Sequence, residues 1–218
     1  MRHGQASFGA DDYDQLSELG ARQCEALGAH LAALGIRPQA VITGSLRRHH
    51  QSLQAFAKGH GALAPELVWP GLNEYDSLAL IEALPPGEPL PPADTPEGFK
   101  AHFRRLRVAL AEWMDGRIEP RGMPTYAEFA QGVREALAHV CAHHVGQTVL
   151  VVSSGGPIST AVSQVIGAPA RSSIDLNMRM RNSSLTETVF NARGHQLVSF
   201  NAVPHLESAE RRAWVTHA

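Results

Sequence analysis

The sequence contains little cysteine and no long apolar run. Its two cysteines, Cys24 and Cys141, stand far apart and form no Cys-x-x-Cys pair. This spacing excludes a disulfide framework and favours a reducing compartment, so we expect a cytoplasmic protein. No stretch approaches the roughly 18 apolar residues of a transmembrane helix. The first residues also lack the apolar core of a signal peptide, so no membrane partner is predicted.

The chain also lacks an excess of positive charge. It carries 19 Lys and Arg residues against 21 Asp and Glu residues, a formal net charge of −2. A general nucleic-acid binder or a protein of acidic membranes would show a basic excess, so both are excluded. Lysine is scarce, with Lys58 and Lys100 beside seventeen arginines. This ratio is typical of codon usage in a GC-rich genome. Arginine also forms bidentate hydrogen bonds with phosphate, so the position of each arginine decides whether it is a candidate phosphate ligand.

The composition predicts a folded chain with one domain. Apolar residues make up 44% of the 218 residues and charged residues 18%, which excludes disorder. We therefore expect a single domain over residues 1–218. Residues 85–98 contain six prolines and predict a loop, because proline fixes φ and removes an amide donor. This loop and its neighbouring helices form a predicted insertion at about residues 77–130.

Helical and strand patterns alternate along the chain. The spacing of apolar residues predicts helices at 16–34, 46–59, 99–114, 126–144 and 158–166, strands at 40–42, 67–69 and 148–152, and a late hairpin of strands 184–191 and 196–201. This order predicts an α/β fold with three layers, α/β/α, around a mostly parallel central sheet. Ligands of such sheets bind beyond the carboxyl ends of the strands. We therefore expect the catalytic and ligand-binding side chains in the loops that follow the strands, at residues 2–9, 43–52, 72–76 and 153–157.

The side chains in these loops favour a phosphate site. Arginines from separate loops can bracket a dianion with charge-assisted hydrogen bonds. A neutral imidazole such as His3 can attack phosphorus, and Glu74 can donate a proton to a leaving oxygen. Gly155 and Gly156 lie between a predicted strand and a predicted helix, where free backbone amides favour anions.

Several motifs in order resemble those of the histidine phosphatase superfamily, which is also called phosphoglycerate mutase-like. The opening Arg-His-Gly of that family appears here as residues 2–4, and its Leu-x-x-x-Gly helix with a Gln appears as Leu16 to Gly20 with Gln23. Its Ser-Pro-Leu-x-Arg-Ala-x-Gln-Thr motif corresponds to residues 44–52, which depart at the first two positions but keep Leu46, Arg48 and Gln51. Further matches are Leu72-Asn73-Glu74, Asn182-Ser183-Ser184, Asn201 and His205-Leu206.

The resemblance implies a role for each matching residue. His3 would attack phosphorus in line and become a phosphohistidine. Arg2 and Arg48 would hold the equatorial oxygens, and Glu74 would protonate the leaving alcohol and then activate water. Such phosphoryl transfer needs positioning and charge neutralisation above all. The implied substrate is a small phosphorylated molecule, with no cofactor and no metal.

One departure from the family concerns the second active-site histidine. The family has Ser-His-Gly-Gly where this chain has residues 153–156, so Ser154 replaces that histidine. Ser154 and Gly155 remain candidate phosphate ligands. A neutral bond in place of a charged one lowers the rate by about 10-fold to 30-fold. Two functions are therefore compatible with the sequence: a slow phosphatase, and a degenerate family member that binds a phosphorylated ligand without hydrolysing it. Restoring histidine at Ser154 should raise turnover unless a nearby group compensates; the candidates are Arg47, His49, His50, Arg179 and Arg181.

A second departure lies at the start of the chain. The family motif follows an apolar strand, but only Met1 precedes Arg2. We therefore expect a mis-assigned start or a truncated chain, because a missing central strand leaves backbone groups unpaired.

The remaining alternatives concern the reaction and the assembly. A phosphatase is favoured over a phosphoglycerate mutase, because the insertion lacks a basic run for a sugar acid. Metal binding by His139, His143 and His144 is a weaker alternative, since histidines at an exposed helix end are typical of a solvated surface. The sequence leaves a monomer or a homodimer open.

Overall fold

The computed structural model describes residues 1–6, 14–87, 91 and 95–217. Its centre is a parallel sheet of three strands in the order β2-β1-β3, with β1 at Ala40–Thr43, β2 at Glu66–Val68 and β3 at Val149–Val152. Val41 pairs with Leu150 on one side and with Glu66 on the other. An antiparallel hairpin of β4 (Leu185–Asn191) and β5 (Gly194–Ala202) follows late in the chain.

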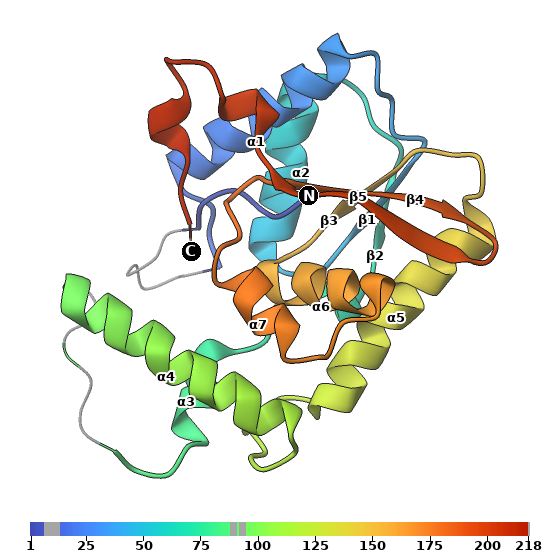
Figure 1. Cartoon of the computed structure of the whole chain (residues 1–218). Coiled ribbons are helices and arrows are strands. Elements are labelled where there is room, and N and C mark those ends of the chain that lie inside the picture. The colour runs from blue at the N-terminus through green and yellow to red at the C-terminus, as the bar shows by residue number, and fades with distance from the viewer. Residues whose placement is uncertain (7–13, 88–90, 92–94, 218) are drawn as a thin grey trace.

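The first three residues extend this sheet beside β3. Arg2 forms a parallel bridge with Ser153, and the His3 amide donates to the Ser153 carbonyl at 2.9 Å. On the other side the Arg2 amide donates to the Ser184 carbonyl at 3.0 Å, just before β4. The N-terminus therefore lies between β3 and the hairpin, as Figure 1 shows. This pairing brings His3 to the carboxyl end of β3.

Helices cover both faces of the sheet. Val41, Leu150 and Val152 pack in one core cluster with α1 (Glu18–Ala33) and α2 (Arg47–His60). Ile42, which points the other way, packs with α5 (Tyr126–His143). Successive side chains of a strand point to opposite faces, so the two clusters lie on opposite sides of the sheet. The three layers agree with the prediction.

The segment between β2 and α5 builds a core of its own. It contains α3 (Ser77–Glu82) and the long helix α4 (Pro96–Met114), and α7 (Ser172–Asn177) completes the cluster. Figure 1 shows α3 and α4 projecting away from the sheet. The buried residues of this core are Leu80, Leu106, Ala109, Leu110, Trp113 and Ile174.

Helix boundaries follow local capping. The Ser17 hydroxyl accepts from the Gly20 amide at 3.0 Å and starts α1, as predicted. Helix α6 (Gly155–Ile166) begins three residues before the predicted start, so residues 155–157 form its first turn instead of a loop. Pro157 is tolerated there because the first turn needs no amide donor. Short 3₁₀ turns occupy Pro70–Leu72, Pro204–Leu206 and Arg212–Trp214. In the described part of the chain, no helix has the length and apolarity needed to cross a membrane.

Candidate active site

The predicted site residues come together at the carboxyl edge of the sheet. Arg2 and His3 lie in the N-terminal segment, Arg48 in the first turn of α2, and Ser154 at the N-cap of α6, two residues after β3. All four are buried, with 0% to 6% of their surface exposed. The charges of Arg2 and Arg48 both act on the pKa of His3 and on that of Glu74, so these segments share one electrostatic site.

The hydrogen bonds of His3 leave one ring nitrogen ready to react. Nδ1 lies 2.7 Å from the Gly4 carbonyl oxygen. A carbonyl only accepts, so Nδ1 carries the hydrogen and Nε2 keeps its lone pair. Burial, and then the positive charges of Arg2 and Arg48, hold the pKa of His3 well below its usual value. His3 is therefore a neutral imidazole at pH 7, which is the form that acts as a nucleophile.

Two serines fix the backbone around His3. The Ser183 amide donates to the His3 carbonyl at 2.9 Å, with Ser183 at a positive φ of 55°. The Ser183 hydroxyl lies 2.8 Å from Nε2 of the buried His205. On the other side, the Ser52 hydroxyl accepts from the Gly4 amide and donates to the Arg48 carbonyl, at 3.1 Å and 2.7 Å. His3 and Arg48 are thus held by one network of hydrogen bonds.

Protein groups orient both guanidinium groups. Arg2 donates through Nη1 to the Met180 carbonyl. Arg48 donates through Nη1 to Asp14 Oδ1 at 2.8 Å, in a pair whose arginine side chain is only 7% exposed. Asp14 also accepts from the Arg47 amide at 2.8 Å, which supplies the helix cap that α2 otherwise lacks. A planar guanidinium fixed in this way is suited to charge-assisted bonds with a phosphoryl group.

The N-terminus of α6 holds a carboxylate of the protein itself. The Gly156 amide donates to both Glu74 oxygens, at 3.0 Å and 3.1 Å. The sequence predicted that backbone amides at Gly155 and Gly156 favour anions, and the Gly156 amide bonds to the carboxyl group of Glu74. A Cβ at Gly156 would overlap Glu74 Oε1 and lie 2.6 Å from Tyr75 Cε1, so only glycine allows this approach. Burial raises the pKa of Glu74 despite the opposing effects of Arg48 and the Gly156 amide, and a raised pKa suits a proton donor.

Gly155 and Ser154 occupy the turn from β3 into α6. Gly155 is the first residue of α6, next to the side chain of Asn177, whose Nδ2 donates to the Tyr75 hydroxyl at 2.5 Å. The Ser154 hydroxyl lies 2.7 Å from Nε2 of His49. The backbone amide of Gly155 and the hydroxyl of Ser154 therefore stand beside the strand end that positions His3.

His49, one of the compensating candidates named from the sequence, lies close to His3 in the structure. It is fully buried, and its ring centroid lies 5.9 Å from that of His3. The signal was present in the sequence, because His49 stands where the family motif has alanine. Of the other compensating candidates, His50 faces outward and pairs with Glu66 at 3.0 Å.

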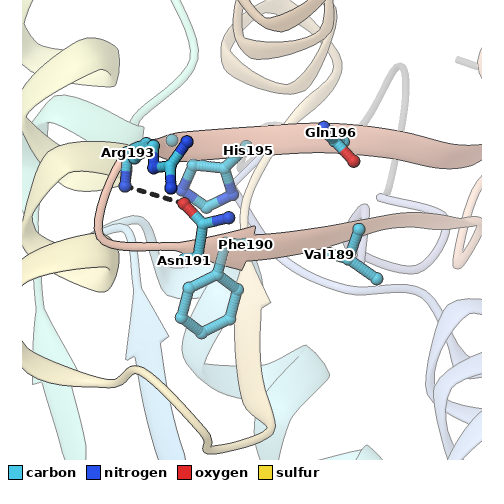
Figure 2. A pocket seen from close by; sticks show the side chains of 7 residues that line it. Val189, Phe190, Asn191, Arg193, His195 and Gln196 are labelled. Atoms are coloured by element: carbon cyan, nitrogen blue, oxygen red, sulfur yellow. Dashed lines mark hydrogen bonds between the residues drawn. The ribbon is translucent and has the colours of Figure 1, made fainter.

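Two other kinds of polar region among the described residues bear comparison with this site: clusters of potential metal ligands and a hollow at the β4–β5 hairpin. Within the described ranges, no group of three or more His, Cys, Asp or Glu side chains is arranged to hold a metal ion. A hollow of about 350 Å³ lies at the tip of the β4–β5 hairpin and is shown in Figure 2. Its His195 places Nε2 at 3.0 Å from the Leu137 carbonyl and Nδ1 at 3.2 Å from the Thr188 hydroxyl. Both ring nitrogens have partners there, and none of the predicted site residues lines this hollow.

Comparison with known families identifies the family of this chain. The sequence model of the histidine phosphatase superfamily (branch 1) matches residues 1–88 and 90–203. The chain belongs to the histidine phosphatase superfamily. No curated protein gave a significant match.

Solved structures of histidine phosphatase type share the fold. A mycobacterial glucosyl-3-phosphoglycerate phosphatase is 21% identical with a TM-score of 0.63, covering 92% of this chain and 96% of its own. The alpha-ribazole phosphatase of Shigella flexneri is 18% identical with a TM-score of 0.63, covering 93% and 94%. A phosphoserine phosphatase of Entamoeba histolytica, in complex with 3-phosphoglyceric acid, is 18% identical with a TM-score of 0.64, covering 94% and 96%. At these identities the likeness shows the fold.

Proposed function

We propose that this histidine phosphatase superfamily member hydrolyses phosphate monoesters of small molecules through a phosphohistidine on His3. The observation that carries the proposal is the hydrogen bond from His3 Nδ1 to the Gly4 carbonyl, at 2.7 Å, beside two fixed guanidinium groups. It leaves a neutral Nε2 with its lone pair in the positive field that a phosphoryl dianion requires.

In the first step, His3 Nε2 attacks phosphorus and an N–P bond forms. The bond between phosphorus and the ester oxygen breaks, and the leaving oxygen takes the electron pair. The Glu74 carboxyl gives its proton to this oxygen, so an alcohol departs. The raised pKa of Glu74 supports this role, because it favours the protonated acid before the step.

In the second step, water attacks the phosphorus of the phosphohistidine. Glu74, now a carboxylate, takes a proton from the water while the N–P bond breaks and returns its electron pair to His3 Nε2. Inorganic phosphate leaves, and both residues regain their starting forms. The Gly156 amide supports the carboxylate in this interval, since it donates to both of its oxygens.

Four further groups would hold the phosphoryl oxygens. Arg2 and Arg48 supply the two positive charges, and Ser154 and the Gly155 amide supply neutral donors at the start of α6. Donors and cations that are fixed before the reaction stabilise the charge of the transition state without reorganisation. This assignment is supported by the burial of Arg2, Arg48 and Ser154 around His3.

The substrate class draws support from the structural neighbours. The similar structures described above are named as phosphatases of phosphoserine, alpha-ribazole phosphate and a sugar phosphoglycerate, all small phosphorylated compounds. We therefore favour a small phosphomonoester over transfer within a phosphoglycerate. The free cysteines Cys24 and Cys141 support a cytoplasmic location.

Rapid-quench labelling tests the proposal directly. The protein is mixed with a ³²P-labelled phosphomonoester, quenched in base, and examined for a protein-bound phosphate that is stable in base and labile in acid. We expect this label in the wild type and none in H3A. We expect E74Q to label slowly with alkyl phosphates, because its side chain has no acidic proton.

A second candidate is a phospholigand-binding protein without turnover, which is favoured by Ser154 in place of the family's histidine. It predicts saturable binding of inorganic phosphate with no acid-labile label and no released alcohol. A wild-type protein that behaves in this way would overturn the phosphatase proposal.

A further inference from the structure

A second imidazole lies inside the site and takes no part in the steps above. His49 is 0% exposed, follows Arg48 in the first turn of α2, and has its ring centroid 5.9 Å from that of His3. Burying a polar ring is costly unless it is hydrogen-bonded. Its contacts therefore indicate what it does.

The residues around His49 leave a space that its ring fills. A Cβ at Gly44 would overlap His49 Nδ1 and lie 2.7 Å from His49 Cε1, so the ring fills the space of a side chain at residue 44. On the opposite side, Nε2 lies 2.7 Å from the Ser154 hydroxyl oxygen. The ring is held between Gly44 and Ser154, with little freedom to turn.

Through its hydrogen bond with Ser154, the imidazole of His49 can act indirectly on the phosphoryl group. In the protonated ring both nitrogens carry hydrogen, so His49 Nε2 donates to the Ser154 oxygen and the hydroxyl hydrogen is left to donate to another acceptor. Ser154 follows Ser153, whose carbonyl accepts from the His3 amide. A phosphoryl group on His3 is therefore the acceptor that this geometry favours.

The charges around His49 make it responsive to an anion. Burial, followed by the charge of Arg48, lowers the pKa of His49 to about 3, with Asp14 acting in the opposite direction. The imidazole of His50 also lowers this pKa, and the ring centroid of His3 lies 5.9 Å away. His49 is neutral at pH 7 without a ligand. A phosphoryl dianion nearby favours the protonated ring and so strengthens the bond to Ser154.

We infer that His49 is a positioning residue for phosphoryl transfer, whose imidazole acts through the Ser154 hydroxyl on the phosphoryl group of His3. The inference rests on the proposed phosphatase function. It explains how a chain with serine at position 154 retains an imidazole at the phosphoryl site.

Three variants test it by the rate of phosphohistidine formation. H49Q keeps a neutral donor of similar size but cannot take a proton, so we expect labelling about 10-fold to 30-fold slower. H49A should be at least as slow. The double variant H49A/S154H places the imidazole at residue 154 and should recover most of the lost rate. The matched control is H60Q, because His60 is also a buried histidine of α2 but donates to the Ile36 carbonyl, at 2.8 Å.

The outcomes separate a positioning role from a structural one. A purely structural role would make H49Q and H49A unstable without rescue by the relocated imidazole. If H49Q labels at the wild-type rate, or if folded H49A/S154H is no faster than H49A, the inference is wrong.

A binding measurement without turnover tests the role of His49 separately from the proposed phosphatase activity. Inorganic phosphate is titrated at pH 7 into protein with ¹⁵N-labelled histidine rings, and H49Q identifies the His49 signals. We expect the His49 ring nitrogens to shift toward the imidazolium form, and S154A to weaken this shift. Movement of the His3 signals without those of His49 would overturn the inference. Absence of the acid-labile label in the wild type would instead overturn the phosphatase proposal.

Discussion

Replacing Gly156 by alanine should displace Glu74, the proposed proton donor, while leaving His3, the proposed nucleophile, in place. The added Cβ would overlap Glu74 Oε1 and approach Tyr75 Cε1 to 2.6 Å. The Gly156 amide presently donates to both Glu74 oxygens. The carboxylate must therefore move away from α6, whereas none of the three atoms nearest the added Cβ belongs to His3.

The magnitude follows from the lost bond and the displacement. A hydrogen bond to a charged group contributes about 1.5–3 kcal/mol. Misplacement of a reacting group by about 1 Å costs on the order of 100-fold in rate. We therefore expect G156A to lower kcat/KM on an alkyl phosphate, such as glycerol phosphate, by about 100-fold. The loss should be concentrated in the step that protonates the leaving oxygen.

The assay compares two leaving groups in the same variant. An alkoxide needs a proton to leave, whereas the nitrophenolate of p-nitrophenyl phosphate leaves as a stable anion. G156A should therefore lose much less activity on p-nitrophenyl phosphate than on glycerol phosphate, and E74Q should show the same pattern. Circular dichroism checks that G156A is folded. An equal loss on both substrates would refute the assignment of Glu74 as the proton donor.

Stability offers two further predictions. Burial lowers the pKa of His49 and of His205 to about 3, so the unfolded chain binds more protons than the native one below the usual histidine pKa of 6.5. The free energy of unfolding should therefore fall as the pH drops from about 6.5 toward 3, and at pH 5 each of these two histidines should lower it by about 2 kcal/mol. Urea titrations at several pH values measure this fall, which should be smaller in H205Q than in the wild type. Separately, T125A removes the capping box with Glu128 at the start of α5 and should lower the free energy of unfolding by about 1 kcal/mol, with T125S as the control in thermal melts.

The strongest local patterns allowed the fold to be predicted. The apolar run before Ser153 became β3, and Ser17 became the cap of α1, because both follow from short-range physics. The short helices α3 and α7 were missed. Each has only six residues, a span too short to show a helical period, and each is stabilised by packing against α4.

The site could be predicted only as far as topology dictates. Carboxyl ends of parallel strands meet at one edge, so the loops with His3, Glu74 and Ser154 were expected to meet. Which donor serves which acceptor depends on side-chain packing. The sequence indicated that amides near Gly156 favour anions but did not identify Glu74 as the partner, and the part of Asp14 in orienting Arg48 has no signature in the sequence.

Three departures from the family motifs become one feature in the structure. Residue 44 is glycine where the motif has serine, residue 49 is histidine where it has alanine, and residue 154 is serine where the family has histidine. The His49 ring fills the space beside Gly44 and bonds to Ser154, so each residue accommodates the others. Adding histidine at Ser154 alone would place a second ring against that of His49. We therefore expect S154H to bring no gain in turnover unless His49 is made smaller, and a faster S154H enzyme would show that His49 does not serve the phosphoryl group.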